Sequence, residues 1–431
     1  MTPHGADRFA AEEFALAERL FAQLRAASQA AAGDDVGITR DSYGAGESAA
    51  IDVIAGTARA HGLAVSRDAA ANLVVSVPGS DPRLPTLACG SHLDSVPRGG
   101  NFDGAAGVVA GLLALIRLRA ISATLRRGIH LYGLRGEESA AFGRAYLGSR
   151  ALFGRLTPDD LEARHARTGR SLEAAMADVG ADVAKLTRGE AVLDPASVAA
   201  WLELHIEQGP VLVARDHPVA IVTGIRGNVR HRAITCVGEA GHSGAVPRWL
   251  RRDAVFAVAE LLTRLDAHWQ ALLAHGHDLV MTCGMLGTDP AEHAITRIPG
   301  CVRLSFEARS QSRETLDAVH ALLQEECLRI AEERGVRFAF DDRLDAASAR
   351  MDPAWVARLG AIAEGLGIAP ESMASGAGHD AAVFANEGIP SAMIFVRNAN
   401  GSHNPDEAMA MSDFMTGVDI LFRALAAGGS A

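Results

Sequence analysis

The stretch Cys89-Gly90-Ser91-His92-Leu93-Asp94 continues the apolar run Thr86–Cys89 and places an imidazole where a predicted strand meets its loop. In α/β sheets, functional side chains gather at the carboxyl ends of parallel strands. Asp94 lies two residues after His92, and a carboxylate there can accept the second ring N–H of a metal-binding histidine. The stretch therefore predicts a strand of an α/β domain that carries a metal ligand at its end.

Apolar runs and helix-like segments alternate on both sides of this stretch, from about residue 51 to residue 221. Examples are the apolar runs Leu73–Val77 and Ile129–Leu134 and the helix-like segment Gly107–Leu118. This alternation is typical of an α/β fold, and we predict a mixed, largely parallel sheet with flanking helices.

The order of elements changes between residues 214 and 347. A strand, a helix, two strands, a helix and a strand follow one another there, which predicts an α+β sandwich of the split-βαβ type. The α/β pattern then resumes. We therefore predict a discontinuous first domain, residues 1–213 and 348–431, with the second domain, residues 214–347, inserted into it. A chain of 431 residues also favours two domains, because single cores stop growing near roughly 250–300 residues.

Composition narrows the classes of function. The formal net charge is −11, and no Lys/Arg cluster with interleaved aromatic residues is present, so nucleic acid is not an expected partner. The longest apolar stretch, Gly104–Ile116, is too short to span a bilayer. The five cysteines are odd in number and scattered, which favours reduced thiols. Because no secretory leader pattern is found, we expect a cytoplasmic protein.

Four further polar groups follow predicted strands or precede a helix. Asp103 stands just before an apolar, Gly/Ala-rich helix, where a carboxylate can bridge two cations. Glu137 and Glu138 follow the strand Ile129–Leu134, and two adjacent acids suggest that one binds metal while the other accepts a proton from water. His205 ends another strand, and His403 lies in Ser-His-Asn-Pro near the C-terminus.

Three histidines and two carboxylates together suit two divalent ions of the Zn²⁺, Mn²⁺, Co²⁺ or Ni²⁺ type, about 3.5–4 Å apart. Each residue has an ordinary alternative. A single histidine is usually a surface or core residue, Asp94 alone can be a loop cap, and Glu137-Glu138 alone can be a solvated pair. The joint occurrence of these residues at strand ends of one domain favours a shared site.

These motifs resemble those of the M20-type metal-dependent amidohydrolases, in the branch of N-carbamoyl-L-amino-acid hydrolases, allantoate amidohydrolases and β-ureidopropionases. The resemblance covers nearly the whole chain. It rests on five stretches: Gly90–Asp94, Gly99–Gly104, Glu203–Pro210, Ser375–Asp380 and Ser402–Pro405.

The resemblance implies a role for each matching residue. One ion would be bound by His92, Asp103 and His205, and the other by Asp103, Glu138 and His403. Glu137 would be the general base. The inserted domain would act as a lid and carry the contact of a homodimer.

Substrate contacts are also implied by the resemblance. His242 would stabilise the tetrahedral oxyanion, and Arg309 would pair with a substrate carboxylate, a task that suits a planar guanidinium. Gln208 and His379 match further substrate positions. The sequence departs from the family at Thr296, which replaces a lid asparagine, and losing such an amide can change selectivity by orders of magnitude.

The expected activity is the metal-dependent hydrolysis of a linear amide C–N bond in a small, carboxylate-bearing ureido compound, first of all an N-carbamoyl-L-amino acid. Allantoate hydrolysis and β-ureidopropionase activity are the nearest alternatives. A dipeptidase with the same metal site, and a binding protein that has lost turnover, are the other readings. The retained Glu137 and the complete ligand set argue against the binding protein.

Overall fold

The structure is a computed structural model that describes residues 3–32, 36–121 and 124–430. The chain divides into two compact units, Met1–Thr223 with Arg350–Ala431 (unit 1) and Gly224–Ala349 (unit 2). Unit 2 begins after the predicted boundary at residue 214, because β6 (Val219–Ile225) pairs with β17 (Ser391–Val396) in the sheet of unit 1.

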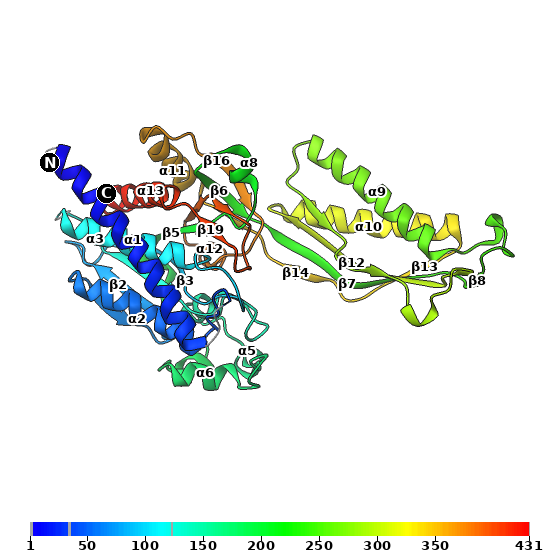
Figure 1. The fold of residues 1–431 in the computed structure, drawn as a ribbon, viewed down its shortest axis with the longest axis horizontal. Helices are drawn as coiled ribbons and strands as arrows, with labels where there is room; N and C mark the ends of the chain where they lie inside the picture. The colour runs from blue at the N-terminus through cyan, green and yellow to red at the C-terminus, as the bar shows by residue number, and fades with distance from the viewer. Residues whose placement is uncertain (1–2, 33–35, 122–123, 431) are drawn as a thin grey trace. The chain divides into compact units, whose positions relative to one another are not determined.

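Unit 1 is built on a nine-stranded mixed sheet in the order β1-β2-β4-β3-β5-β17-β6-β15, with β16 paired to β6 (Figure 1). The four central strands β4, β3, β5 and β17 run parallel, and the flanking strands β2 and β6 pair antiparallel with β4 and β17, which confirms the predicted fold class. The other strands are β1 (Ala64–Arg67), β2 (Leu73–Val77), β3 (Thr86–His92), β4 (Ile129–Leu134), β5 (Val198–Ile206), β15 (Ala349–Arg350), β16 (Glu371–Ser375) and the separate pair β18 (Asn398–Ala399) and β19 (Ala408–Met409).

Helices cover the sheet of unit 1 and bury its apolar side chains. They are α1 (Pro3–Ala32), α2 (Ala45–Ala60), α3 (Ala105–Ala120), α4 (Leu147–Leu152), α5 (Pro158–Glu162), α6 (Leu172–Asp178), α7 (Val183–Thr187), α8 (Val211–Arg215), α11 (Pro353–Gly365), α12 (Asp380–Asn386) and α13 (Met411–Ser430). Helix α3 is apolar on nearly every side and lies between the sheet and α13, as its composition requires.

The side chains of strand β5 divide between the apolar core and the face that carries the polar residues. Side chains alternate between the two faces of a strand. Leu202 and Leu204 therefore enter the core formed with α3 and α13, while Glu203 and His205 point to the opposite face. On that face Trp201 stacks on Phe384 of α12, with ring centroids 3.7 Å apart.

Unit 2 is an antiparallel six-stranded sheet with two long helices packed on one face. Its strands are β7 (Gly227–Val237), β9 (Val280–Thr282), β10 (Leu286–Gly287), β12 (Cys301–Ser310), β13 (Arg337–Phe340) and β14 (Leu344–Ala346). Helix α9 (Ala254–Ala274) starts at the N-cap Asp253, and α10 (Arg313–Arg334) ends at Gly335 in a left-handed conformation. A separate two-stranded ribbon is formed by β8 (Gly241–His242) and β11 (Arg297–Ile298).

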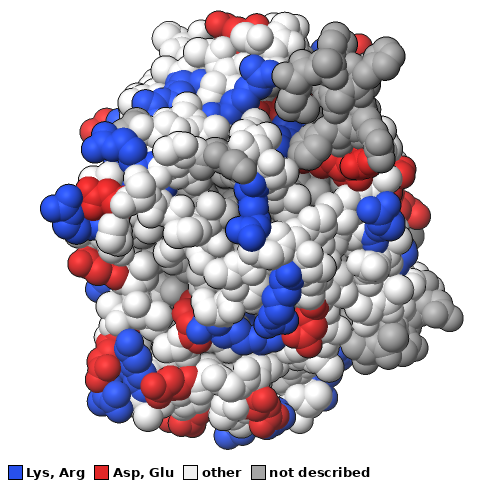
Figure 2. Space-filling view, turned by 90° about the vertical axis from the view of Figure 1, so that its left-hand side faces the viewer, with Lys and Arg blue, Asp and Glu red and all other residues white. Residues whose placement is uncertain are grey.

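Charged side chains of both signs are interspersed on the face of the molecule shown in Figure 2. No helix in the described part of the chain has the length and apolarity that a bilayer-spanning segment needs.

Candidate metal centre

Three neighbouring parallel strands deliver polar side chains to one edge of the sheet of unit 1. His92 is the last residue of β3, and Glu137 and Glu138 follow β4, whose Leu134 is paired with His92. His205 lies near the end of β5 on the other side of β3. Asp103 reaches the same edge from the turn before α3. The four segments thus meet as the strand-end argument predicts.

The imidazoles of His92 and His205 face each other with their Nε2 atoms 3.4 Å apart. The Nδ1 atom of His205 lies 3.0 Å from the carbonyl of Ile206, and that of His92 lies 3.2 Å from the carbonyl of Asp94. Because both Nδ1 atoms meet acceptors, the neutral form of each imidazole would carry its proton on Nδ1 and keep a lone pair on Nε2.

Both Nε2 atoms lie close to the Asp103 carboxylate, whose Oδ1 atom lies 3.5 Å from His92 Nε2 and 3.3 Å from His205 Nε2. Three electron-pair donors that converge in a buried position repel one another unless protons or a metal ion lie between them. Nitrogen and carboxylate donors are the ligands that Zn²⁺ and related divalent ions accept. The three residues therefore fit one metal ion.

A second group of ligands shares Asp103 with the first. His403 Nε2 lies 3.4 Å from Asp103 Oδ2 and 3.2 Å from Glu138 Oε1. Each group of three has ligand atoms within 4.8 Å of one another. A carboxylate that belongs to both groups is the arrangement that a bridged pair of ions requires.

The electrostatics of these residues point to the same conclusion. Burial disfavours the charged imidazole of His92, but Glu137, Asp103 and Asp94 raise its pKa well above the usual range. Burial also opposes ionisation of Asp103, yet the three surrounding histidines hold its pKa well below its usual value. Hydrogen bonds to Asp103 and Glu138 raise the pKa of His403 to about 10. The site thus attracts positive charge, which metal ions would supply in place of protons.

Glu137 belongs to neither group of ligands but lies beside them. Its Oε2 atom is 3.9 Å from His92 Nε2, and the residue is only 7% exposed. Burial raises the pKa of Glu137 well above its usual value, against the attraction of His92 and with the help of Glu138. A carboxylate that lies next to the ligands and has an increased proton affinity is suited to act as a general base.

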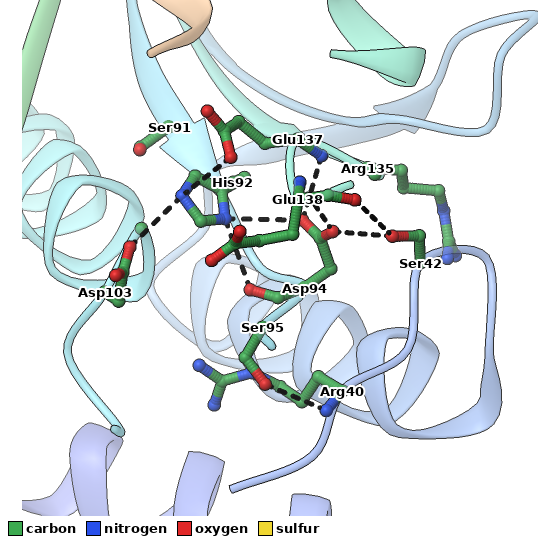
Figure 3. Close-up of polar contacts among 12 residues, drawn as sticks. Arg40, Ser42, Ser91, His92, Asp94, Ser95, Asp103, Arg135, Glu137 and Glu138 are labelled. Atoms are coloured by element: carbon green, nitrogen blue, oxygen red, sulfur yellow. Dashed lines mark hydrogen bonds and ion pairs between the residues drawn. The ribbon is translucent and has the colours of Figure 1, made fainter. Parts of the chain in front are cut away.

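Asp94 contacts the ring of His92 and also holds the loop of Glu137 and Glu138. Its carboxylate lies 3.3 Å from His92 Nδ1 and accepts hydrogen bonds from the backbone N–H groups of Glu137 and Glu138, both at 3.1 Å (Figure 3). The hydroxyl of Ser42 donates to the same carboxylate at 2.7 Å. The Asp94 carboxylate therefore holds both the ring of His92 and the loop that carries Glu137.

Asp103 is held by residues that the sequence argument did not assign. The Glu407 carboxylate accepts hydrogen bonds from the backbone N–H groups of Phe102, at 2.8 Å, and Asp103, at 3.2 Å. The hydroxyl of Ser402 lies between this carboxylate and Asp103 Oδ2. Ser402 belongs to one of the motifs quoted above. No local pattern marks Glu407, because the two N–H groups that it binds lie about 300 residues earlier in the chain.

Gln208 also faces the bridging carboxylate. Its side-chain amide donates to Asp103 Oδ2 at 2.8 Å, and its backbone adopts a left-handed conformation with φ of 64°. Its Oε1 atom is buried and has no hydrogen-bond partner among the residues that the structure describes. An unpaired amide oxygen next to the candidate ligands suits a residue that also receives a hydrogen bond from a substrate.

A third group of possible ligands, Glu203, His205 and His379, lies behind His205. Both oxygens of Glu203 are occupied, because they accept hydrogen bonds from Ser91, Trp201 and the backbone of Ala381. Burial, followed by the nearby His205, lowers the pKa of His379 well below its usual value. Glu203 therefore has a positioning role rather than free ligand atoms.

A cavity of about 130 Å³ opens over the candidate ligands. His379, predicted as a substrate contact, packs against His205 and is 1% exposed, whereas its neighbour Gly378 lines the cavity. The lining residues are His92, Asp103, Glu137, Glu138, Ser139, Ala145, Tyr146, His205, Gln208, Gly378 and His403.

The other predicted substrate contacts belong to unit 2. His242 lies on β8, is exposed and is paired with Arg297, and the carbonyl of Thr296 accepts a hydrogen bond from Ser243 at 2.8 Å. Arg309 lies near the end of β12, with its guanidinium 3.1 Å from the Glu307 carboxylate. His242 and Thr296 thus share one ribbon, and Arg309 lies elsewhere in the unit.

Known proteins match this chain over most of its length. The model of the peptidase family M20/M25/M40 matches residues 88–427. An N-carbamoyl-L-amino acid amidohydrolase of Geobacillus stearothermophilus is 35% identical over 94% of this chain and 97% of its own. An allantoate amidohydrolase of Escherichia coli is 31% identical over 84% of this chain and 86% of its own.

A solved structure shares the fold. The crystal structure of a hydantoinase/carbamoylase family amidase from Burkholderia ambifaria superposes with a TM-score of 0.84 and 30% identity, over 96% of both chains. The matches in sequence and in fold agree with the ligand geometry of unit 1, and the chain belongs to the peptidase family M20/M25/M40.

Proposed function

We propose that this protein hydrolyses the amide C–N bond of a small ureido acid, and that an N-carbamoyl-L-amino acid is its first candidate substrate. The main support for this proposal is the buried Glu137 carboxylate, which lies beside two groups of ligands that share Asp103. Amidohydrolases of N-carbamoyl amino acids and of allantoate among the relatives support the same class of reaction.

The activity would use two divalent metal ions, of the Zn²⁺, Mn²⁺, Co²⁺ or Ni²⁺ type. His92, Asp103 and His205 would hold one ion, and Asp103, Glu138 and His403 the other. Bound there, the ions would polarise the scissile carbonyl and increase the acidity of water. Asp94 and Glu407 keep the ligands in place through the hydrogen bonds described above.

Glu137 moves the proton in this proposal. Its carboxylate accepts a proton from the attacking water and then donates it to the leaving nitrogen. The position of the carboxylate, beside both groups of ligands and with Oε2 3.9 Å from His92 Nε2, suits both proton transfers.

We further propose that unit 2 acts as a lid and supplies His242 as the oxyanion donor, with Arg309 and Thr296 as substrate contacts. Figure 1 places β8 at the end of unit 2 opposite to β14, and Ala346 of β14 and Arg309 both pair with Asn228. Residue 301 begins β12 and residue 309 lies near its end, so the two are roughly 25 Å apart at the usual rise per residue.

This separation exceeds the length of a small ureido acid. We infer that His242 and Arg309 of one protomer do not reach the same substrate molecule. A homodimer, in which each site combines Arg309 of one protomer with His242 of its partner, resolves this difficulty. We accordingly propose a homodimer built through unit 2. The free, scattered cysteines fit a reducing compartment, so we also propose a cytoplasmic location.

Allantoate is the second candidate substrate, because an allantoate amidohydrolase is 31% identical to the chain. The test is to measure ammonia and amino acid release by metal-stripped protein after addition of Mn²⁺, Zn²⁺, Co²⁺ or Ni²⁺. The panel contains N-carbamoyl L- and D-amino acids, allantoate, 3-ureidopropionate and dipeptides. Metal-dependent turnover of a ureido acid supports the proposal, cleavage of dipeptides alone moves the protein to the peptidases, and no turnover supports a binding protein.

A further inference from the structure

Tyr146 adopts a backbone conformation that is rare for a bulky side chain. Its φ and ψ are 59° and 35°, in the left-handed region, and it stands immediately before α4 without a side-chain hydrogen bond to cap that helix. Glycine and asparagine occupy this region at less cost than tyrosine. Non-glycine residues in strained conformations cluster at functional sites, where the surrounding structure enforces them.

The strained backbone is tied to the loop of the proposed base. The N–H of Tyr146 donates to the carbonyl of Glu137 at 3.0 Å, and the N–H of Leu147 donates to the carbonyl of Gly136 at 2.7 Å. These bonds direct the phenol of Tyr146 into the cavity that Glu137, Glu138 and Gly378 also line. Any movement of the phenol is therefore limited by the same backbone that positions Glu137.

The side chain of Tyr146 fits in this position because residue 378 is a glycine. A Cβ atom built on Gly378 would overlap the hydroxyl oxygen of Tyr146. The ring of Tyr146 thus reaches the backbone of residue 378 and forms a wall of the cavity together with it. Any side chain at position 378 would push the phenol out of its place.

The hydroxyl of Tyr146 remains available to a ligand. Within the described residues, the hydrogen bonds of Tyr146 involve its backbone: its N–H donates to Glu137, and its carbonyl accepts from Arg150 and Ser149. Burial, followed by the nearby carboxylates of Glu137 and Asp380, raises the pKa of the phenol, so it keeps its proton. A neutral phenol can both donate and accept a hydrogen bond.

The cavity suits a small polar group. Its volume of about 130 Å³ corresponds to on the order of four water molecules at about 30 Å³ each. A ureido group, H₂N–CO–NH, has four non-hydrogen atoms. The carboxylate of Glu137, which belongs to neither group of ligands, also lines the cavity and can accept an N–H donor.

We propose that Tyr146 is a specificity-determining residue, whose ring, placed against Gly378, limits the size of the acyl group and whose hydroxyl accepts a hydrogen bond from the terminal NH₂ of a ureido substrate. This inference rests on the proposed function, because it assigns the residue that distinguishes a carbamoyl group from an acetyl group of the same shape. Amides that present a methyl group leave the hydroxyl unpaired and are selected against.

The test compares N-carbamoyl and N-acetyl derivatives of one L-amino acid, on the metal-loaded protein and on its Tyr146→Phe variant. Binding is measured by calorimetry in a Glu137→Gln background, where hydrolysis does not interfere, and turnover is measured in the wild-type background. Tyr146→Phe keeps the ring and removes the hydroxyl. We expect the preference for carbamoyl over acetyl, in Kd and in kcat/KM, to decrease at least tenfold.

Two further variants test the size limit. Tyr146→Ala should extend turnover to N-propionyl and N-benzoyl derivatives, and Gly378→Ala, which displaces the phenol, should weaken the carbamoyl preference as Tyr146→Phe does. Tyr132→Phe, which removes a tyrosine hydroxyl on β4 outside the cavity lining, is the matched control and should keep the wild-type preference. An unchanged carbamoyl-to-acetyl ratio of Kd in Tyr146→Phe overturns the inference. Lack of ureido turnover in the wild type contradicts the proposed function instead, since the Kd ratio is measured independently.

Discussion

His92 and His205 direct their Nε2 atoms at each other across 3.4 Å, beside the Asp103 carboxylate. Burial opposes the charged imidazoles, but the nearby carboxylates raise the pKa of both histidines, so protons occupy this position in the metal-free protein. A divalent ion that replaces these protons is expected to stabilise the folded protein. An ion present at a hundred times its Kd adds about 2.7 kcal/mol to the unfolding free energy.

Thermal unfolding of chelator-treated protein should therefore shift upward by several degrees when Zn²⁺ or Mn²⁺ is added back. His205→Ala should reduce this shift, while His61→Ala, an exposed position at the end of α2, should retain it. Equal unfolding temperatures with and without ions would argue against a metal site at these histidines.

Replacing Glu137 by Gln should remove the proton carrier while leaving the ligands in place. Turnover is expected to fall by about 10²–10⁴-fold, with the metal content of the purified protein unchanged by elemental analysis. Glu138→Gln is the informative comparison, because it should lower the metal content as well. A Glu137→Gln protein that binds metal and keeps near wild-type turnover would exclude the assigned role.

Glu407 links the turn of Asp103 to the loop of His403 through three hydrogen bonds. Glu407→Ala should lower the free energy of unfolding by about 2–4 kcal/mol and weaken metal binding roughly tenfold or more, as measured by denaturation and by metal titration. Glu407→Gln keeps an oxygen for the two N–H groups and should have a smaller effect on both quantities.

Glu387→Gln is the control for this prediction. Glu387 pairs with Arg155, whose side chain is 62% exposed, so its replacement should cost less than about 1 kcal/mol. If Glu407→Ala binds metal with wild-type affinity, the positioning role assigned to Glu407 is incorrect.

His242 and Arg309 provide a test of the proposed dimer. His242→Ala and Arg309→Ala should each lose most activity. When the two variants are mixed under conditions that exchange subunits, a heterodimer regains one complete site, and random pairing gives about a quarter of the wild-type activity. No recovery after verified subunit exchange would show that each site draws both residues from the same protomer.

The cysteines allow a prediction about pH. Burial raises the pKa of Cys89, Cys236 and Cys327 to about 12, so their thiols stay protonated near pH 8. A thiol reagent should react in the native protein with the partly exposed Cys283 and Cys301, and with all five cysteines after denaturation.

The raised pKa values of these three thiols also determine how the free energy of unfolding changes with pH. Above about pH 9 the unfolded thiols ionise while the folded ones do not. The contribution of the three buried cysteines to stability is therefore fully present below pH 9 and is lost as the pH rises toward 12. Rapid native labelling of Cys89 at pH 8 would contradict the burial of this β3 side chain.

The candidate ligands could be named from the sequence because each one follows a local pattern. His92, Glu138 and His205 come at or just after apolar strands, and Asp103 precedes an apolar helix, so the strand-end rule for parallel sheets brings them together. The fold class followed from the same alternation of strands and helices.

Residues that act through distant partners could not be found in this way. Glu407 meets the N–H groups of a turn about 300 residues earlier, and Tyr146 meets the backbone of Gly378. The boundary of unit 2 was placed too early, because the pairing of β6 with β17 depends on a strand that comes much later in the chain. Contacts of long sequence separation leave no periodicity that a local pattern could reveal.

The position of β17 has a consequence for synthesis on the ribosome. This strand lies between β5 and β6 although it is translated long after both. Unit 2 is continuous in sequence and has its own core, so it can fold as soon as it emerges, whereas unit 1 must wait for its central strand and for His403. A nascent chain would accordingly carry a folded insert and an open sheet, and hydrolytic activity would appear only after translation has passed the last ligand.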